Sequence, residues 1–556
     1  MLLPDGQIDL RYALSRLRGI ARPPVTITPP PRGVSFERDV SVRMRDGTVL
    51  RVNVFRPEGT QRCPVIMSAH PYGKDGFPKP VLGGYRPSVQ YRVMRQPRPV
   101  QFSAWTTWEA PDPAFWVPRG YVVVNADLRG FFRSEGEGNL LTAAEGNDYH
   151  DLIEWAGTQP WSTGKVGLNG VSYLALSQWR AAATQPRHLA AICPWEGFSD
   201  IYRDLAMRGG IREQGFFHLW ASAVPKSGRY LVNLRAEQEA HPLHDDFWDA
   251  LVPDLARIEV PALVCGSFSD HNLHSGGSFD GFRRIGSQEK WLYTHGGGKW
   301  AEYYSEEALN FQARFFDCFL KGEDNGMRQQ PPVRLEIRAS GSEIYEVRGA
   351  RSFPLPDTRW SEQCLHPDGT LRRAPVAEPS QVSFDASTGS ASFLLRCDED
   401  FVLAGPMALR LWVSVAGAND ACLFVGLRKR DARGREVFFE GSYGFGRDFV
   451  SHGWLRVSHR ERDEARTEPF WPVHLHRRAA PLAPGEIVPI DIPLLPAAVL
   501  VRREESLELC IQGRWFHARN PVLGGAAAYE QSPGGIVIIH LGGQYDGRLL
   551  IPMLSP

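Results

Sequence analysis

Residues 164–179 have the sequence GKVGLNGVSYLALSQW, which predicts a buried strand, a tight turn at Ser172 and then a helix. Gly170 lets the chain turn sharply because it carries no Cβ. A serine held between strand and helix, with small residues two before and three after it, is the nucleophile-elbow pattern. The helix N-terminus there stabilises the negative charge of an acyl-transfer intermediate. Ala175 stands where the pattern has glycine, and an ordinary turn with a surface serine remains the alternative.

The composition is that of a soluble globular protein. The chain has 556 residues, with 63 Lys plus Arg and 63 Asp plus Glu. Because there is no surplus of basic residues, the composition does not favour nucleic-acid binding. We see no signal peptide and no run long enough to span a bilayer. The eight cysteines are scattered singly without metal-site spacing, which favours reduced thiols in a cytoplasmic protein.

The hydrophobic pattern divides the chain into segments. Residues 1–34 are rich in Arg and Pro and are expected to form an extended arm. Buried-strand runs alternate with helical patterns over 35–198 and 259–328, which predicts a mostly parallel sheet. Residues 199–258 are helical in pattern and form an insertion over that sheet. From 329 to 556 short alternating strands and turns predict an all-β sandwich.

Four chemically suitable residues follow predicted strands directly: Tyr72, Ser172, Asp270 and His295. The carboxyl ends of parallel strands share one edge of a sheet, so these side chains are expected to meet there. Serine needs a base and a carboxylate that orients it. The order Ser, Asp, His along the chain is that of α/β-hydrolases.

The chain resembles the cocaine esterase family of serine hydrolases, with its X-Pro dipeptidyl-peptidase and α-amino acid ester hydrolase relatives. The motifs that carry the resemblance span nearly the whole chain: Arg45-Asp46-Gly47, Pro71-Tyr72-Gly73-Lys74, Asp127-Leu128-Arg129-Gly130, Ser134-Glu135-Gly136, Ile153-Glu154-Trp155, Gln159-Pro160-Trp161, Gly170-Val171-Ser172-Tyr173 and Gly453-Trp454-Leu455-Arg456-Val457-Ser458-His459-Arg460. The resemblance implies an α/β fold: an α/β-hydrolase core, a helical cap at 199–258 and a C-terminal jelly roll.

The resemblance also implies roles for the site residues. Ser172 would be the nucleophile, His295 the general base and then acid, and Asp270 the orienting carboxylate. The oxyanion would be held by the Tyr173 backbone N–H and by the Tyr72 hydroxyl. No metal and no organic cofactor is expected.

Two departures from the family leave alternatives open. The family has Gly-Pro-Trp-x-His before its catalytic histidine, whereas this chain has Trp291-Leu292-Tyr293-Thr294-His295 and then three glycines. His271 or His274 is therefore the competing base, and Asp280 the competing carboxylate; the position at a strand end favours His295 and Asp270. No carboxylate follows Asp270 directly, so an α-amino substrate is not favoured.

Three further expectations concern the surroundings of the site. An irregular aromatic loop supplies Trp105, Trp108 and Trp116 as candidate substrate-binding residues, although the rings could equally pack the loop onto the protein. Asp127 and Arg129 are expected to form a structural ion pair beneath the site. Lys74 either caps a loop or faces an acidic substrate.

The predicted function is hydrolysis of a small-molecule carboxylic ester, or an amide, through an acyl-enzyme. The rivals are an acyltransferase or lactone-forming enzyme on the same triad, and a non-catalytic binding protein on a hydrolase scaffold. A dipeptidyl peptidase would require an acidic site for a free amine. Neither nucleic acid nor a membrane is expected as a partner, and a homodimer is a candidate assembly.

Overall fold

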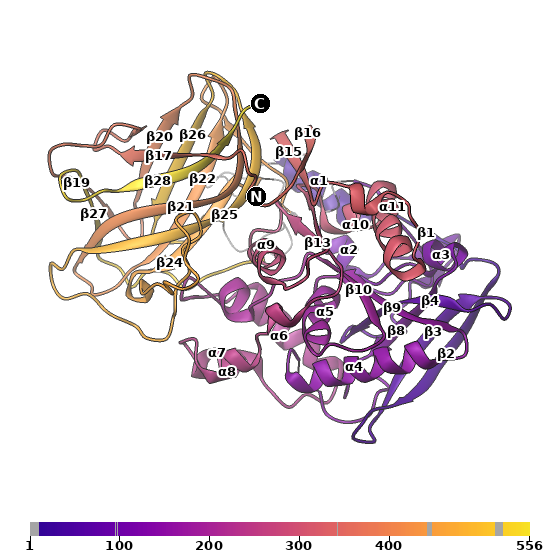
Figure 1. Cartoon of the computed structure of the whole chain (residues 1–556). Helices are drawn as coiled ribbons and strands as arrows, with labels where there is room; N and C mark the ends of the chain where they lie inside the picture. The colour runs from indigo at the N-terminus through magenta and orange to yellow at the C-terminus, as the bar shows by residue number, and fades with distance from the viewer. Residues whose placement is uncertain are drawn as a thin grey trace.

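A computed structural model describes residues 10–94, 96, 98–138, 140–341, 343–441, 447–517 and 526–556. Figure 1 shows two parts side by side, a mixed α/β part and a C-terminal part made mostly of strands. The first nine residues of the predicted N-terminal arm lie outside the described residues. Within the described residues, no helix combines the length and the apolar character needed to cross a membrane.

The centre of the α/β part is a sheet whose middle strands are parallel. Its strands, in order of pairing, are β2 (Val34–Arg43), β3 (Val49–Pro57), β8 (Val122–Asp127), β4 (Cys63–His70), β9 (Ser162–Val171), β10 (Leu189–Trp195), β13 (Ala262–Ser267), β14 (Lys290–His295), β15 (Val333–Ser340) and β16 (Glu343–Ala350). The predicted hairpin near the N-terminus is β2 and β3, and the predicted strand runs match β4, β8, β9, β10, β13 and β14.

Helices cover both faces of this sheet, which explains why its strands are continuous apolar runs. Within β4, Val65 and Met67 pack into one core and Ile66 into another. The first core includes α4 (Ala143–Thr158), α5 (Tyr173–Ala183) and α9 (Ser275–Arg284), and the second includes α3 (Pro113–Trp116), α10 (Lys299–Tyr303) and α11 (Glu306–Phe316).

The segment between β10 and β13 is mainly helical, as predicted. It holds α6 (Phe216–Ala223), α7 (Leu234–Ala240) and α8 (Asp246–Ala250), with a short hairpin of β11 (Met207–Arg208) and β12 (Ile211–Arg212). Figure 1 places these helices at the lower edge of the α/β part, toward the C-terminal strands.

The C-terminal part consists of two groups of antiparallel strands around one apolar core. One group is β17 (Arg359–Leu365), β28 (Arg548–Leu554), β21 (Phe401–Ala416), β25 (Val488–Val501), β27 (Ile536–Leu541) and β19 (Ser380–Asp385); the other is β20 (Ser390–Arg396), β26 (Ser506–Gln512), β22 (Cys422–Arg430) and β24 (Ser451–Arg456). Alternate residues of these strands, such as Leu409, Leu411 and Val413, fill the core, which is the period-2 pattern predicted from the sequence.

Part of the N-terminal arm and of the loop before β8 is more regular than expected. The arm contains the helix α1 (Leu10–Ala21) and the strand β1 (Val25–Thr28), and β1 pairs with β7 (Val100–Ser103) of the aromatic loop. That loop also carries β5 (Lys79–Val81), β6 (Gly84–Arg86), α2 (Val89–Val93) and α3. The extended arm was therefore wrong over 10–21, where Leu14 and Leu17 follow the helical spacing.

Candidate active site

Ser172 occupies a strained turn between β9 and α5. Its φ is 60° and its ψ −118°, a conformation that few non-glycine residues adopt. The Ser172 N–H donates to the Trp195 carbonyl at 3.0 Å, and its own carbonyl accepts from the Ala175 N–H at 2.8 Å. Gly170 has a φ of 145°, and a Cβ there would lie 2.5 Å from Leu174. The elbow predicted from the sequence is therefore present.

The departure at Ala175 has a local compensation. A Cβ built on Gly197, in the segment after β10, would lie 2.6 Å from the Ala175 methyl group. The methyl therefore occupies space that a side chain at position 197 would need. Glycine is therefore needed at position 197 of the loop, where it leaves room for the Ala175 methyl group on the helix.

The imidazole that contacts Ser172 belongs to His274. Its Nε2 lies 3.0 Å from the Ser172 hydroxyl, and the Phe198 N–H donates to its Nδ1 at 3.3 Å. The ring stacks on the Phe198 ring and is 1 % exposed. Burial, together with the nearby charges of Lys299 and Arg208, holds the pKa of His274 well below its usual value. The ring is therefore neutral near pH 7.

His295, the base favoured by the sequence, has a different partner. Its Nε2 lies 3.0 Å from Oε1 of Glu196, and both side chains are fully buried. Its Nδ1 has no hydrogen-bond partner among the described residues, so neither ring nitrogen is bonded to Ser172. The pKa of His295 is raised; burial lowers it, but the Glu196 charge and hydrogen bond outweigh that effect.

Asp270 lies at the predicted strand end, but it pairs with a lysine instead of a histidine. Lys299 Nζ, at the start of α10, is 2.7 Å from Asp270 Oδ2, and both side chains are buried. Burial raises the pKa of Asp270 to about 6, partly offset by the Lys299 charge. The competitor Asp280 forms an ion pair with Arg284 on α9.

A tight turn after β13 explains why His274 takes the place expected for His295. The N–H groups of Leu273, His274 and Ser275 all point to the Asp270 carbonyl at 3.2 Å. The Ser275 hydroxyl donates back to the Ser267 carbonyl at 2.6 Å. The chain thus folds back within one turn, and His274 directly precedes α9.

The two residues predicted for the oxyanion lie beside the elbow. Tyr173 is the first residue of α5, and its hydroxyl donates to Glu145 of α4 at 2.5 Å. The ring of Tyr72 is 6.1 Å from that of Tyr173, and its hydroxyl accepts from the Trp220 indole N–H at 3.4 Å. Burial raises the pKa of Tyr72, so its hydroxyl stays protonated.

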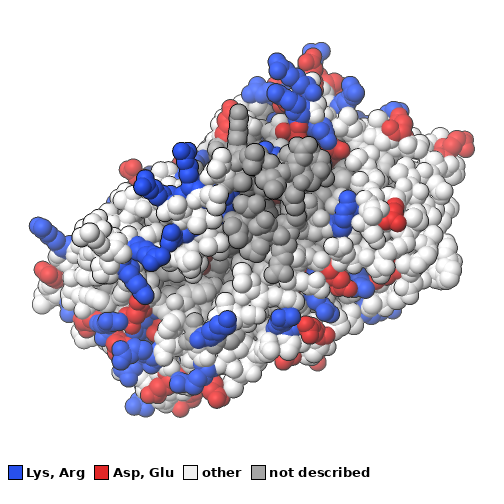
Figure 2. All heavy atoms as spheres, turned by 180° about the vertical axis from the view of Figure 1, so that it is seen from behind, with Lys and Arg blue, Asp and Glu red and all other residues white. Residues whose placement is uncertain are grey.

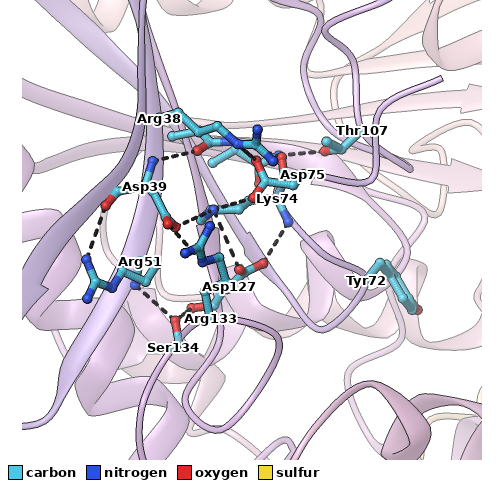
Figure 3. Close-up of polar contacts among 12 residues, drawn as sticks. Arg38, Asp39, Arg51, Tyr72, Lys74, Asp75, Thr107, Asp127, Arg133 and Ser134 are labelled. Carbon is cyan, nitrogen blue, oxygen red and sulfur yellow. Dashed lines mark hydrogen bonds and ion pairs between the residues drawn. The ribbon is translucent and has the colours of Figure 1, made fainter. Parts of the chain in front are cut away.

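A buried ion network fixes the loop that carries Tyr72. Lys74 Nζ lies 2.9 Å from Asp39, 2.7 Å from Asp75 and 3.9 Å from Asp127, and the Lys74 N–H donates to Asp127 at 2.7 Å. Figure 3 shows these carboxylates around Lys74, with Tyr72 pointing away from them. Of the two roles left open for Lys74, the loop-fixing role matches these contacts.

The expected ion pair between Asp127 and Arg129 was wrong. Arg129 pairs with Asp148 at 2.6 Å and with Asp46 at 2.8 Å, whereas Asp127 binds Lys74. Asp127 is the last residue of β8 and Arg129 lies in the loop beyond it, so the regular spacing of the strand does not bring the two side chains together.

The aromatic loop mainly packs onto the protein. Trp116 is fully buried against Tyr121 and Phe316, and Trp105 packs on Phe36 and Phe55. The substrate-binding interpretation is therefore wrong for Trp116, and Trp105 contributes to the same core. Trp108 differs: its ring is tilted against that of Trp300, and it lines a cavity of about 420 Å³.

Two buried carboxyl groups at the site escaped the sequence analysis. Glu196 follows β10 directly and pairs with His295. Glu109 lies in the aromatic loop, and its carbonyl accepts the N–H of Val171, the residue before the nucleophile, at 3.1 Å. The strand-end rule could have found Glu196, whereas only the folded loop brings Glu109 to the elbow.

The described residues include one group of side chains arranged like metal ligands: His271, Asp448 and His452, with one ligand atom from each within 4.8 Å of the others. The Asp448 carboxylate lies 3.0 Å from His271 and 2.7 Å from His452. These are hydrogen-bond distances, and they join the loop after Asp270 to the C-terminal part.

Comparison with known proteins follows the same division of the chain. Residues 46–238 match the family model for X-Pro dipeptidyl-peptidase (S15 family), and 325–550 match that of the X-Pro dipeptidyl-peptidase C-terminal non-catalytic domain. A crystal structure of a CocE/NonD family hydrolase from Staphylococcus aureus is 38 % identical, with a TM-score of 0.89, over 93 % of this chain and 94 % of that one. The chain belongs to the CocE/NonD family of hydrolases.

More distant relatives agree with this assignment. The cocaine esterase of Rhodococcus is 26 % identical over 65 % of this chain and 67 % of its own. An α-amino acid ester hydrolase structure, 16 % identical with a TM-score of 0.68 over 94 % of this chain and 97 % of that one, shares the fold. This CocE/NonD hydrolase accordingly has a mixed α/β fold followed by a mostly β, non-catalytic C-terminal domain.

Proposed function

We propose that this protein hydrolyses a carboxylic ester, or more slowly an amide, through an acyl-enzyme on Ser172. The observation that carries the proposal is a strained serine at the N-terminus of α5 whose hydroxyl lies 3.0 Å from a buried, neutral imidazole. A nucleophile and a base in hydrogen-bond contact are what acyl transfer requires. Family membership, and the name of the cocaine esterase relative, support an ester substrate.

In the first half of the reaction, Ser172 Oγ attacks the ester carbonyl and His274 takes the serine proton. The Tyr173 N–H and the Tyr72 hydroxyl donate to the oxyanion that forms. His274 then gives the proton to the leaving alcohol, and the C–O bond breaks. The Phe198 N–H donates to Nδ1 at 3.3 Å, which favours the tautomer with the proton on Nε2. Base catalysis needs the other tautomer, with the proton on Nδ1, so this long hydrogen bond must break first.

In the second half, water attacks the acyl-enzyme along the reverse path and releases the acid. Added alcohols or amines compete with water at this step, so the product ratio distinguishes a hydrolase from an acyltransferase or a lactone-forming enzyme. The Asp270 carboxylate has no contact with the His274 side chain among the described residues. Its proposed role is therefore to position the turn that carries His274, through the ion pair with Lys299.

We also propose a jelly-roll fold for the C-terminal domain and a reducing compartment for the protein. Two groups of antiparallel strands around one core support a jelly roll for the C-terminal domain. All eight cysteines are free, and seven are buried, which supports a reducing compartment such as the cytoplasm. Figure 2 shows acidic and basic side chains interspersed on one face of the molecule.

The test is a panel of aryl and short-chain esters with wild type and Ser172→Ala. Wild type should turn over several esters and be labelled at Ser172 by a fluorophosphonate, because only an activated serine reacts. Ser172→Ala should lose both properties while remaining folded. No turnover and no labelling of folded wild type would leave a non-catalytic binding protein as the better description, and equal turnover by the two proteins would assign the chemistry to a residue other than Ser172.

A further inference from the structure

Glu109 shares an unusual backbone conformation with the nucleophile. Nine non-glycine residues of the described chain have a positive φ, and three of them, Glu109 (64°), Ser172 (60°) and Glu196 (48°), meet at the elbow. Val171 donates to Glu109, and Ser172 donates to the residue before Glu196. Strain of this kind costs about 1–3 kcal/mol a residue and collects at functional sites. The fold therefore holds Glu109 in place beside Ser172.

The carboxyl group of Glu109 has one oxygen with a partner and one without. Oε1 accepts from the Trp300 indole N–H at 3.1 Å. Oε2 is buried and has no hydrogen-bond partner among the described residues, and the whole residue is 2 % exposed. A buried polar atom left without a partner costs about 1–3 kcal/mol, so it calls for an explanation.

Asp112, in the same loop, shows what a purely structural carboxylate looks like. It is also buried, and both its oxygens are used. They accept from the Ser103 N–H at 2.8 Å, the Ser103 hydroxyl at 2.6 Å and the Ala114 N–H at 2.8 Å. The loop is therefore fastened through Asp112, which leaves the free oxygen of Glu109 without a structural task.

The charges around Glu109 decide its ionic form. Lys299 opposes the effect of burial, whereas Glu196 and Asp270 add to it, and the pKa of Glu109 is raised to about 8. Burial raises the pKa of Tyr72 and of Tyr91, and the charge of an ionised Glu109 adds to both shifts. Near pH 7 Glu109 is thus a carboxylic acid, and the proton on Oε2 is a buried donor.

We propose that Glu109 is a substrate-binding residue whose Oε2–H donates a hydrogen bond to a second acceptor oxygen of the ester, close to the scissile carbonyl. The preferred substrates are then esters with an ether, keto or second ester oxygen near the reacting group. This inference rests on the proposed ester hydrolysis, and Glu109 selects among esters instead of taking part in proton transfer with Ser172.

The experiment compares isosteric esters that differ by one CH₂-to-oxygen replacement. On the acyl side the pair is p-nitrophenyl butyrate and methoxyacetate; on the alcohol side it is butyl and 2-methoxyethyl benzoate. Each enzymatic kcat/KM is divided by the hydroxide-catalysed rate of the same ester to remove intrinsic reactivity. Wild type should prefer the oxygen-containing member of at least one pair by about tenfold at pH 6.5, the size expected of one hydrogen bond.

Three variants test whether Glu109 causes the preference for the oxygen-containing ester. Glu109→Leu should lose the preference at every pH because it has no donor. Glu109→Gln should keep part of it, and keep it unchanged to pH 9, because an amide N–H donates without titrating. In wild type the preference should fall as pH rises through about 8. Asp112→Asn is the matched control for loop stability, and it should keep the wild-type pH dependence.

The inference is overturned if folded Glu109→Leu retains the preference, or if no pair is discriminated by a wild type that hydrolyses all four esters. It is also overturned if p-nitrophenyl 3-aminopropanoate is already preferred to the butyrate at pH 6.5, since Glu109 would then bind an ammonium group as a carboxylate instead of donating a hydrogen bond. Failure of the proposed function looks different, because wild type would hydrolyse none of the esters and resist fluorophosphonate.

Discussion

Ser172 meets an imidazole that lies four residues after Asp270 in the chain, and His295 instead pairs with Glu196. The chemical identities at this site could be predicted from the sequence, because the elbow and the strand ends select serine, aspartate and histidine. Which histidine contacts the serine depends on the turn closed by Ser275, and that turn has no strong local signature. Glu109 needed the folded loop to become visible.

The acid side of the pH profile tests the environment of the two titrating groups. Proton transfer from Ser172 needs a neutral His274, and the buried ion pair with Lys299 at the start of the turn that carries His274 needs an ionised Asp270. The pKa of His274 is well below its usual value, and that of Asp270 is about 6. As the pH falls, Asp270 takes up its proton first. We therefore expect kcat/KM of an uncharged ester to fall near pH 6, below the 6.5 of a free histidine.

A limb at pH 7 or above would contradict this assignment, because it would require an imidazole with a raised pKa, as at His295. Replacing Asp270 by Asn removes the group that titrates near pH 6. In that variant the remaining activity should persist to a lower pH than in wild type.

At the scale of elements, the contact between α5 and the segment after β10 controls the elbow. Gly197→Ala would bring a methyl group within 2.6 Å of the Ala175 Cβ. Overpacking of this kind costs about 1–3 kcal/mol. Thermal unfolding should show a lower Tm, and kcat should fall because α5 carries the oxyanion N–H of Tyr173.

The double variant Gly197→Ala with Ala175→Gly should recover most of both losses, since it restores the total volume. A double-mutant cycle measures this coupling directly. Additive effects of the two substitutions would mean that the close approach does not set the position of α5.

The strand and helix pattern of the sequence predicted the parallel sheet, the helical insertion and the β-rich C-terminal region. Buried runs such as Pro64–Ala69 and alternating runs such as Leu409–Val413 carry that information locally. The helix α1 was missed because the Arg and Pro content of the arm suggested an extended chain. The pairing of Lys74 with three carboxylates was missed because two of them, Asp39 and Asp127, come from β2 and β8, far from Lys74 in the sequence.

At the scale of the whole molecule, Asp448 links the C-terminal domain to the loop that carries Asp270 and His274. Its carboxylate holds His271 at 3.0 Å and His452 at 2.7 Å, and these imidazoles keep the pKa of Asp448 well below its usual value. Asp448→Asn weakens both contacts, at a cost of about 1–3 kcal/mol for buried hydrogen bonds. We expect a lower Tm together with a clear loss of kcat.

Asp420→Asn is the matched control for Asp448→Asn. Asp420 is also buried in the C-terminal domain, where it accepts from Arg456 and Ser458 at 2.7 Å, but it has no contact with the catalytic loop among the described residues. It should lose stability and keep its kcat. Equal kcat values for folded Asp448→Asn and Asp420→Asn would mean that the C-terminal domain does not position the site.

The most direct measurement is the rate at which a fluorophosphonate labels Ser172 in wild type, His274→Gln and His295→Gln, each checked for folding. A general base contributes about 10²–10⁴-fold. We expect His274→Gln to slow labelling by at least a hundredfold and His295→Gln to stay within about tenfold of wild type. The reverse order would assign the base to His295 and contradict the site described above.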